Sequence, residues 1–144
     1  MNVKHVVALG FVTGIIGVAA QLPLLKLGLM ASGSLRGMVS LVLAIGIGVI
    51  AGTWAPKEGV KAAALAGVIA GTMFSLIGFG AVLMDPSVIG QKPFDSPEAF
   101  FLFVSSLLSS TVIVSWLVAG VSALVALPVS LSRVAEMEFE QQGA

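Results

Sequence analysis

Cysteine is absent from this sequence, and charged residues are scarce. The lack of cysteine excludes disulfide bonds, thiol catalysis, iron–sulfur ligation and cysteine lipidation. Charged residues make up only 10% of the chain, whereas a soluble domain carries about 25%. Hydrophobic residues make up 58% and the mean hydropathy is +1.10, so there is too little polar surface to cover a globule in water. Lipid is therefore the expected solvent.

Charge balance and histidine content narrow the functional classes further. The net charge is zero, so nothing favours nucleic acid as a partner. His5 is the only histidine, whereas metal and haem sites in helical bundles usually draw ligands from several positions. No nucleophile–base pair is evident. We therefore expect no catalytic residue, no metal site and no cofactor, and a non-enzymatic role is favoured over an enzymatic one.

Four apolar segments are long enough to cross a bilayer as helices, which takes about 20 residues each. They are residues 6–25, 35–55, 62–84 and 99–131. Because the connections are short, successive helices should be antiparallel neighbours. The sequence predicts an all-α membrane bundle of four antiparallel helices with both termini on the same face. Residues 1–131 form a single domain in this interpretation, and residues 132–144 form a short acidic tail.

The fourth segment has a clear start signal. Ser96 can cap the helix, Pro97 suits its first turn, and Glu98 favours the positive end of the helix dipole. The segment is longer than a bilayer requires, so we expect it to tilt, to protrude, or to change direction near Pro128.

Localisation and orientation follow from the same pattern. The length of residues 6–25 favours a retained membrane helix over a cleaved signal peptide. The protein is expected in a cell membrane or an inner-type organelle membrane. The face that holds both termini carries slightly more basic residues than the other, which favours cytoplasmic termini. The basic residues are Lys4, Lys57, Lys61 and Arg133 on that face, and Lys26, Arg36 and Lys92 on the other.

Charged residues lie in the connections, the tails or the first turn of a helix. Proton and cation relays usually need an ionisable group inside the membrane, and none is expected here. The glycine-rich hairpin of residues 35–84 superficially resembles the rotor proteolipid of rotary ATPases. It lacks the mid-helix carboxylate of that family, which argues against membership.

Small residues recur on one face of the second and third helices, where the stretch GVIAGT occurs at 48–53 and again at 67–72. In lipid, helices associate through close contacts that small residues permit. An antiparallel hairpin centred on the short loop between the two helices pairs these positions. The predicted pairs are Gly52 with Ala63, Gly48 with Gly67, Ala44 with Gly71, Ser40 with Ser75, and Gly37 with Gly78. We therefore predict a closely packed seam, and the first helix adds one GxxxG pair.

The fourth helix is rich in hydroxyl groups. The candidates for a polar path along it are Ser105, Ser106, Ser109, Ser110, Thr111, Ser115 and Ser122. Such hydroxyls can bond the carbonyl one turn back, so contact between helices is an alternative explanation. Gln21 in the first helix is interpreted as a hydrogen-bonding partner between helices.

Two functions are compatible with this pattern. The favoured one is a non-catalytic structural or accessory subunit of a membrane complex, or a homo-oligomer, packed through Gly/Ala/Ser faces. Its partners would be the lipid bilayer and other membrane subunits or further copies of the chain. The alternative is a small oligomeric transporter or channel with the hydroxyl groups of the fourth helix lining the path.

Overall fold

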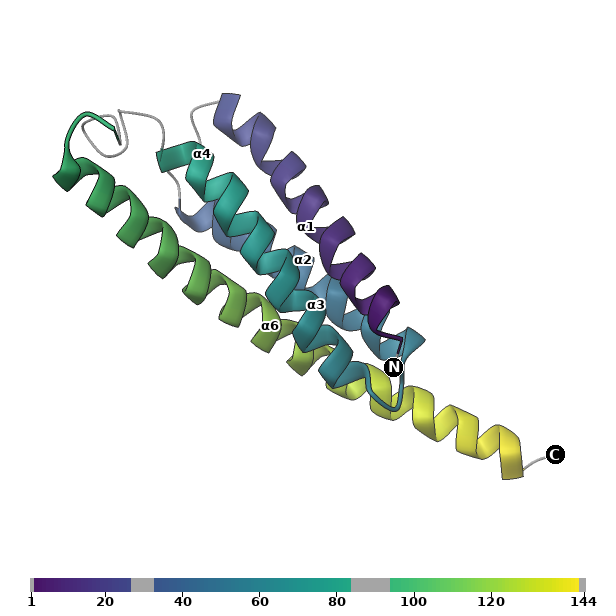
Figure 1. Cartoon of the computed structure of the whole chain (residues 1–144). Coiled ribbons are helices and arrows are strands. Elements are labelled where there is room, and N and C mark those ends of the chain that lie inside the picture. The colour runs from purple at the N-terminus through teal and green to yellow at the C-terminus, as the bar shows by residue number, and fades with distance from the viewer. Residues whose placement is uncertain (1, 27–32, 84–93, 143–144) are drawn as a thin grey trace.

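The computed structural model describes residues 2–26, 33–83 and 94–142, and in these ranges the chain is almost entirely helical (Figure 1). Four helical spans of this part are long and apolar enough to cross a membrane. The first two lie in α1 (Val3–Lys26) and α2 (Gly33–Trp54), the third begins with α3 (Gly59–Met73), and the last lies in α6 (Pro97–Gln142). The predicted all-α bundle of four membrane helices is confirmed.

The third span changes its helix type near one end. After α3 the chain forms a π-helical segment, η2 (Phe74–Phe79), and then a last α-helical turn, α4 (Gly80–Leu83). The sequence predicted an uninterrupted helix over 62–84, because nothing in its pattern of apolar residues marks a π-turn. π-Helical turns are rare in proteins, and those that occur are frequently found at functional sites.

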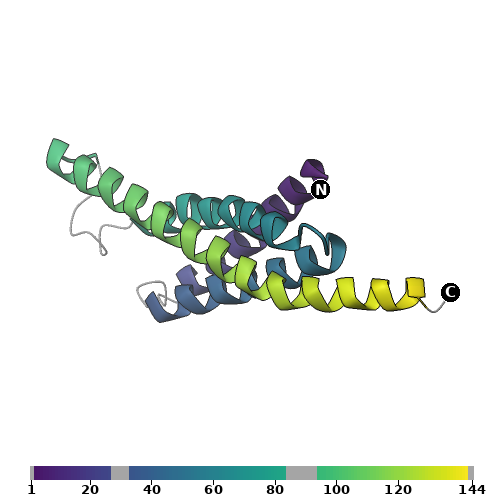
Figure 2. The ribbon, with the colours of Figure 1, turned by 90° about the horizontal axis from the view of Figure 1, so that it is seen from below.

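The last span is one helix of 46 residues, so residues 132–142 continue as helix beyond the predicted membrane segment. Ser96 caps its start, with its Oγ accepting a hydrogen bond of 3.1 Å from the Ala99 amide. Pro128 lies inside α6 and removes one backbone donor, which is a usual cause of a helix bend. Figure 2 shows α6 bending before its C-terminal part leaves the bundle. The helix therefore both bends and protrudes.

α3 is the central helix of the bundle. It lies between α1 and α6 and contacts both, while α2 packs against α6, α3 and α1 (Figure 1). Half of the third span is buried, compared with 28% of each of the others. The N-terminus and the C-terminus lie at the same end of the bundle.

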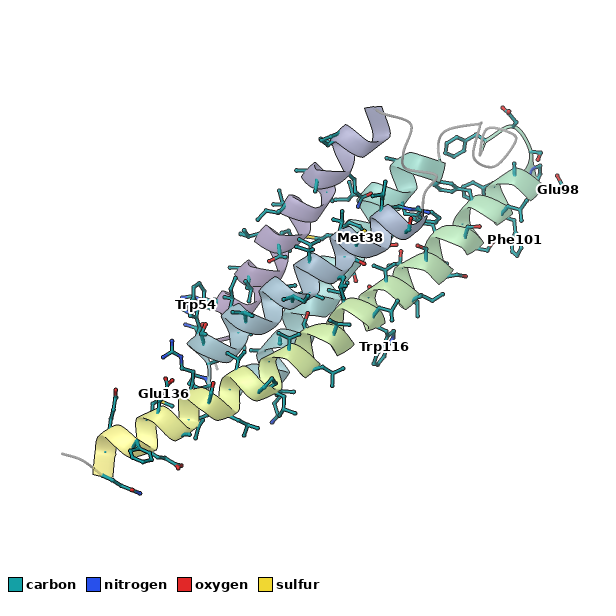
Figure 3. The ribbon with its side chains drawn as sticks, turned by 180° about the vertical axis from the view of Figure 1, so that it is seen from behind. Met38, Trp54, Glu98, Phe101, Trp116 and Glu136 are labelled. Atoms are coloured by element: carbon teal, nitrogen blue, oxygen red, sulfur yellow. The ribbon has the colours of Figure 1, made fainter. Side chains whose placement is uncertain are left out.

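Small side chains build the core, and large apolar ones cover the outside. The core residues are mainly alanines, among them Ala44, Ala51, Ala62, Ala63, Ala66, Ala70 and Ala126. On the outer surface, Phe101 and Trp116 point away from the bundle along α6 (Figure 3) and are 70% and 75% exposed. An exposed apolar surface of this kind is the one that a bilayer solvates.

Gly48 and Gly52 of α2 and Gly67 and Gly71 of α3 lie against α6, and Gly48 does not meet Gly67. A β-carbon added at Gly48 would be 2.6 Å from the Ser122 carbonyl oxygen, and one at Gly67 would be 2.7 Å from the Cα of Ala119. The predicted seam considered only two helices. In the structure α6 lies along both, so the small faces of α2 and α3 give it room for a close approach.

Candidate polar binding pocket

A cavity of about 240 Å³ lies in the half of the bundle away from the termini, and we call it the polar pocket. It is lined by Gln21 of α1, Arg36, Gly37 and Ser40 of α2, Phe74, Ser75 and Phe79 of η2, and Ser110, Val114 and Leu117 of α6. Its inner wall is buried, whereas Gly37 and Leu117 are exposed at its outer side. Side chains from all four membrane spans therefore meet at one cavity, whose wall combines these polar groups with a larger apolar surface.

Gln21 forms the back of the polar pocket. Its side chain is 3% exposed, and its Nε2 donates a hydrogen bond of 3.3 Å to the carbonyl oxygen of Phe74 in η2. A carbonyl can only accept, so this contact fixes which end of the amide faces η2. The other end, Oε1, is buried and has no hydrogen-bond partner in the described part of the chain. The contact confirms Gln21 as a hydrogen-bonding partner between helices, and it leaves Oε1 without a partner in the wall of the cavity.

Arg36 supplies the charge of the polar pocket. The sequence placed this residue at the membrane boundary, in the first turn of the second helix. In the structure its side chain turns inward and is half-buried, with the guanidinium carbon 4.8 Å from the centroid of the Phe79 ring. The ring covers the flat face of the cation. The Nε atom is buried and, among the residues that the structure describes, has no hydrogen-bond partner.

Hydroxyl groups of η2 and α6 form the third side. Ser75 is 1% exposed, and its Oγ lies 3.2 Å from both Ser110 Oγ and Thr111 Oγ1. One turn further into the bundle, Thr72 Oγ1 lies 2.9 Å from Ser115 Oγ. Hydrogen-bonded hydroxyls thus extend from the polar pocket into the contact between α3 and α6.

The predicted polar path divides into two groups. Ser110, Thr111 and Ser115 meet the third span as described above. Ser122 is buried further along and bonds the Val118 carbonyl in its own helix, at 2.6 Å. Ser105 and Ser109 likewise bond carbonyls of α6, at 3.2 and 2.7 Å, on a more exposed stretch. Ser106 is half-buried.

Four residues of the predicted seam belong to the polar pocket or border it. Gly37 and Ser40 line it from α2, and Ser75 lines it from η2. Gly78 lies against the amide of Gln21, in a space that a β-carbon would fill. The remaining seam positions lie in the close-packed half. Ala44 and Ala63 are buried in the core, and Gly52 and Gly71 approach α6.

This close packing closes the polar pocket on its inner side. A β-carbon at Gly71 would lie 2.7 Å from the Cα of Ser115, so no space separates α3 from α6 there. Ser115 and Ser122 are therefore buried in a helix contact and do not line an open channel in this conformation.

A larger cavity, of about 710 Å³, lies at the other end of the bundle. It is a notch between the start of α1, the turn from α2 to α3, and Met137 on the protruding part of α6. Its polar side chains are exposed, as His5 and Lys57 are, or half-buried, as Glu58 is. The notch therefore lacks the buried polar atoms that distinguish the polar pocket.

Sequence reasoning missed the polar pocket as a site. Gln21 and Arg36 were noticed singly, but the π-turn that brings Phe74, Ser75 and Phe79 to them has no signature in a single sequence. No protein-family model matches the chain, and no curated protein or solved structure is significantly similar to it. The class that the fold defines is a small helical membrane protein.

Proposed function

We propose that this protein is a small membrane transport protein that binds a polar solute in the polar pocket. The observation that supports this function is the pair of unpartnered polar atoms, Gln21 Oε1 and Arg36 Nε, buried at one cavity. A buried polar group without a partner costs about 1–3 kcal/mol, so the arrangement is unfavourable for stability alone. Ionisable groups turned into a membrane bundle are typical of substrate pathways.

Transport would require two states, because the polar pocket is closed on its inner side. The contacts of Gly67 and Gly71 with α6 would have to open to release the solute toward the face that holds the termini. The hydroxyl pair of Thr72 and Ser115 lies at this closure and would be exposed by the opening. This proposal modifies the hydroxyl path that was predicted along the fourth helix. One half of that path is closed in this conformation, so the hydroxyls do not line it continuously.

The test is a flux assay in proteoliposomes, with radiolabelled phosphate, glycerol and a neutral amino acid as probes. Ser110→Leu fills the polar pocket, whereas Ser109→Leu changes the neighbouring residue, which does not line it. We expect flux of at least one probe with the wild type and Ser109→Leu, and a loss with Ser110→Leu. Equal flux in the two variants, or no flux above empty liposomes, would contradict the transport function.

The second candidate is a non-catalytic subunit of a membrane complex or a homo-oligomer. It is favoured by glycines on the outer surface, because a β-carbon at Gly37, Gly46 or Gly120 would meet no atom within 4 Å. Such positions allow a helix of another subunit to approach closely. Native mass spectrometry after mild extraction tests this function, and a monomer without partners would count against it.

A further inference from the structure

We infer that the polar pocket binds a phosphate-class oxyanion, either free phosphate or the phosphoryl group of a lipid. The inference deepens the proposed function and rests on it for the location of the site. Four kinds of group meet at the cavity: a guanidinium, an amide, hydroxyls and an aromatic ring. Their chemistry identifies the ligand more closely than the size of the cavity does.

The charge of the cavity favours an anion. Arg36 is the one charged side chain among the described residues that line the polar pocket, and no described carboxylate pairs with it. Phe79 covers the face of the Arg36 guanidinium. The N–H groups of Arg36 point outward in the plane of the guanidinium, where the ring does not cover them. A charge that is partly withdrawn from water and has no anionic partner gains from binding an anion. An oxyanion in the cavity would accept from these N–H groups in the two-bond geometry that arginine favours.

Snorkelling is the simpler explanation of Arg36, because an arginine near a helix end can extend toward the membrane surface. It accounts for the long side chain and the contact with Phe79. It does not by itself give a partner to the Nε atom, which is buried although the side chain as a whole is only half-buried. The inward direction of the side chain, into a cavity lined by hydroxyls, favours a bound anion.

Gln21 and the serines distinguish phosphate from other anions. The hydroxyls of Ser75 and Ser110 can each donate to an anion oxygen. Gln21 Oε1 can only accept, as any amide oxygen does, and Nε2 donates one of its two N–H groups to the Phe74 carbonyl. An anion with oxygen acceptors for Arg36 and one O–H donor would also satisfy Oε1, once a small shift of Gln21 brings this buried atom to the cavity. Monohydrogen and dihydrogen phosphate and a phosphomonoester headgroup have such a donor near neutral pH, whereas sulfate and chloride do not.

The π-helical segment explains why the site lies here. In η2 the Phe74 carbonyl accepts from the Gln21 amide, while Ser75 and Phe79 of the same segment both line the cavity. A π-turn changes the direction in which successive side chains point. One short segment thereby positions the amide, a hydroxyl and the ring that supports Arg36.

The experiment measures thermal unfolding of the purified protein in nanodiscs. One arm adds sodium phosphate, sodium sulfate or sodium chloride at equal ionic strength to phosphatidylcholine nanodiscs. The other arm replaces part of the phosphatidylcholine with phosphatidic acid, which has a phosphomonoester headgroup, or with phosphatidylglycerol. We expect a saturable rise in Tm with phosphate or with phosphatidic acid, and a smaller rise with sulfate, chloride and phosphatidylglycerol. A response to phosphate alone would identify a free solute, and a response to phosphatidic acid alone would identify a lipid.

Variants of Arg36 connect the response to the site. Arg36→Gln should weaken binding by about tenfold or more, because charge-assisted hydrogen bonds are lost. Arg36→Lys keeps the charge and the ability to snorkel but loses the two-bond geometry, so it should also weaken binding. Arg133→Gln is the matched control, because Arg133 is exposed on α6 and pairs with Glu136 at 2.9 Å. It should bind as the wild type does.

The inference fails if phosphate and phosphatidic acid stabilise the wild type no more than the other salts and lipids do. It also fails if both Arg36 variants respond like the wild type. The wild-type titrations decide the first point even if a variant does not fold. Flux of a neutral probe without any phosphate response would overturn the oxyanion site and leave transport standing. Phosphate binding without flux would support the oxyanion site and overturn transport.

Discussion

The side-chain amide of Gln21 lies directly against the Cα of Gly78, in the space that a β-carbon at position 78 would occupy. The two residues come from different spans, and η2 is the segment that brings them together. The glycine allows Gln21 to approach the backbone of η2 and to donate to the Phe74 carbonyl. The geometry of the polar pocket therefore depends on the absence of a side chain at position 78.

Gly78→Ala should destabilise the protein and displace Gln21 from η2. A β-carbon at this position overlaps the amide, and overpacking of this kind costs about 1–3 kcal/mol. Unfolding with SDS in mixed micelles, followed by circular dichroism, measures the free energy of unfolding. Gly37→Ala is the control, because a β-carbon there meets no atom within 4 Å. Equal stability of the two variants would contradict the placement of Gln21.

Gly67→Ala should separate α3 from α6. The added β-carbon would lie 2.7 Å from the Cα of Ala119, and neither backbone can move without a shift of a whole helix. We expect a loss of about 1–3 kcal/mol in the free energy of unfolding. In the same assay, Gly120→Ala on the open face of α6 should be neutral or stabilising, by up to about 1 kcal/mol, because alanine favours the helix.

Thr72 and Ser115 should be energetically coupled. Their hydroxyls form a hydrogen bond of 2.9 Å between α3 and α6. A double-mutant cycle with Thr72→Val and Ser115→Ala should give a coupling of about 0.6 kcal/mol, the average for such bonds between membrane helices. A cycle that combines Thr72→Val with Ser109→Ala should give none, because Ser109 bonds the Ser105 carbonyl in its own helix. Equal coupling in both cycles would exclude a specific bond.

The membrane topology can be checked by cysteine labelling, since the chain contains no cysteine of its own. Lys57→Cys in the turn from α2 to α3 and Gln141→Cys near the end of α6 should react from one side of sealed vesicles. Glu98→Cys, at the start of α6, should react from the other (Figure 3). The reagent is a membrane-impermeant maleimide, applied before and after permeabilisation. Reaction of Glu98→Cys from the same side as Lys57→Cys would contradict the four-span arrangement.

The spans could be predicted because hydrocarbon imposes one dominant rule. Every backbone polar group has to be satisfied internally, so long apolar segments become helices, and their limits follow from composition. The Ser96 cap could be predicted for a similar reason, because it depends on neighbours in the sequence. The helix that a small residue contacts is not determined by its neighbours in the sequence. Gly48 and Gly67 have the spacing of a helix contact, but the sequence does not say that the contact is with α6.

The polar pocket could be predicted only in fragments. Gln21 was recognised as a polar residue deep in a helix, and the hydroxyls of α6 were recognised as a group. Arg36 was assigned to the membrane boundary because it lies in the first turn of α2, and the direction of its side chain depends on Phe79 in another span. Phe79 faces Arg36 through the π-turn, which single-sequence periodicity does not reveal.

The π-turn also has a consequence for comparing this chain with others. Each residue of an α-helix turns the chain by about 100°, so one helical wheel describes a regular span from end to end. No single helical wheel describes the third span, because η2 shifts the angular positions of the α4 side chains relative to those of α3. A homologue with a regular helix in this place would keep both ends in register by having one residue fewer. An alignment gap of one position between 74 and 79 would therefore mark relatives that lack the polar pocket.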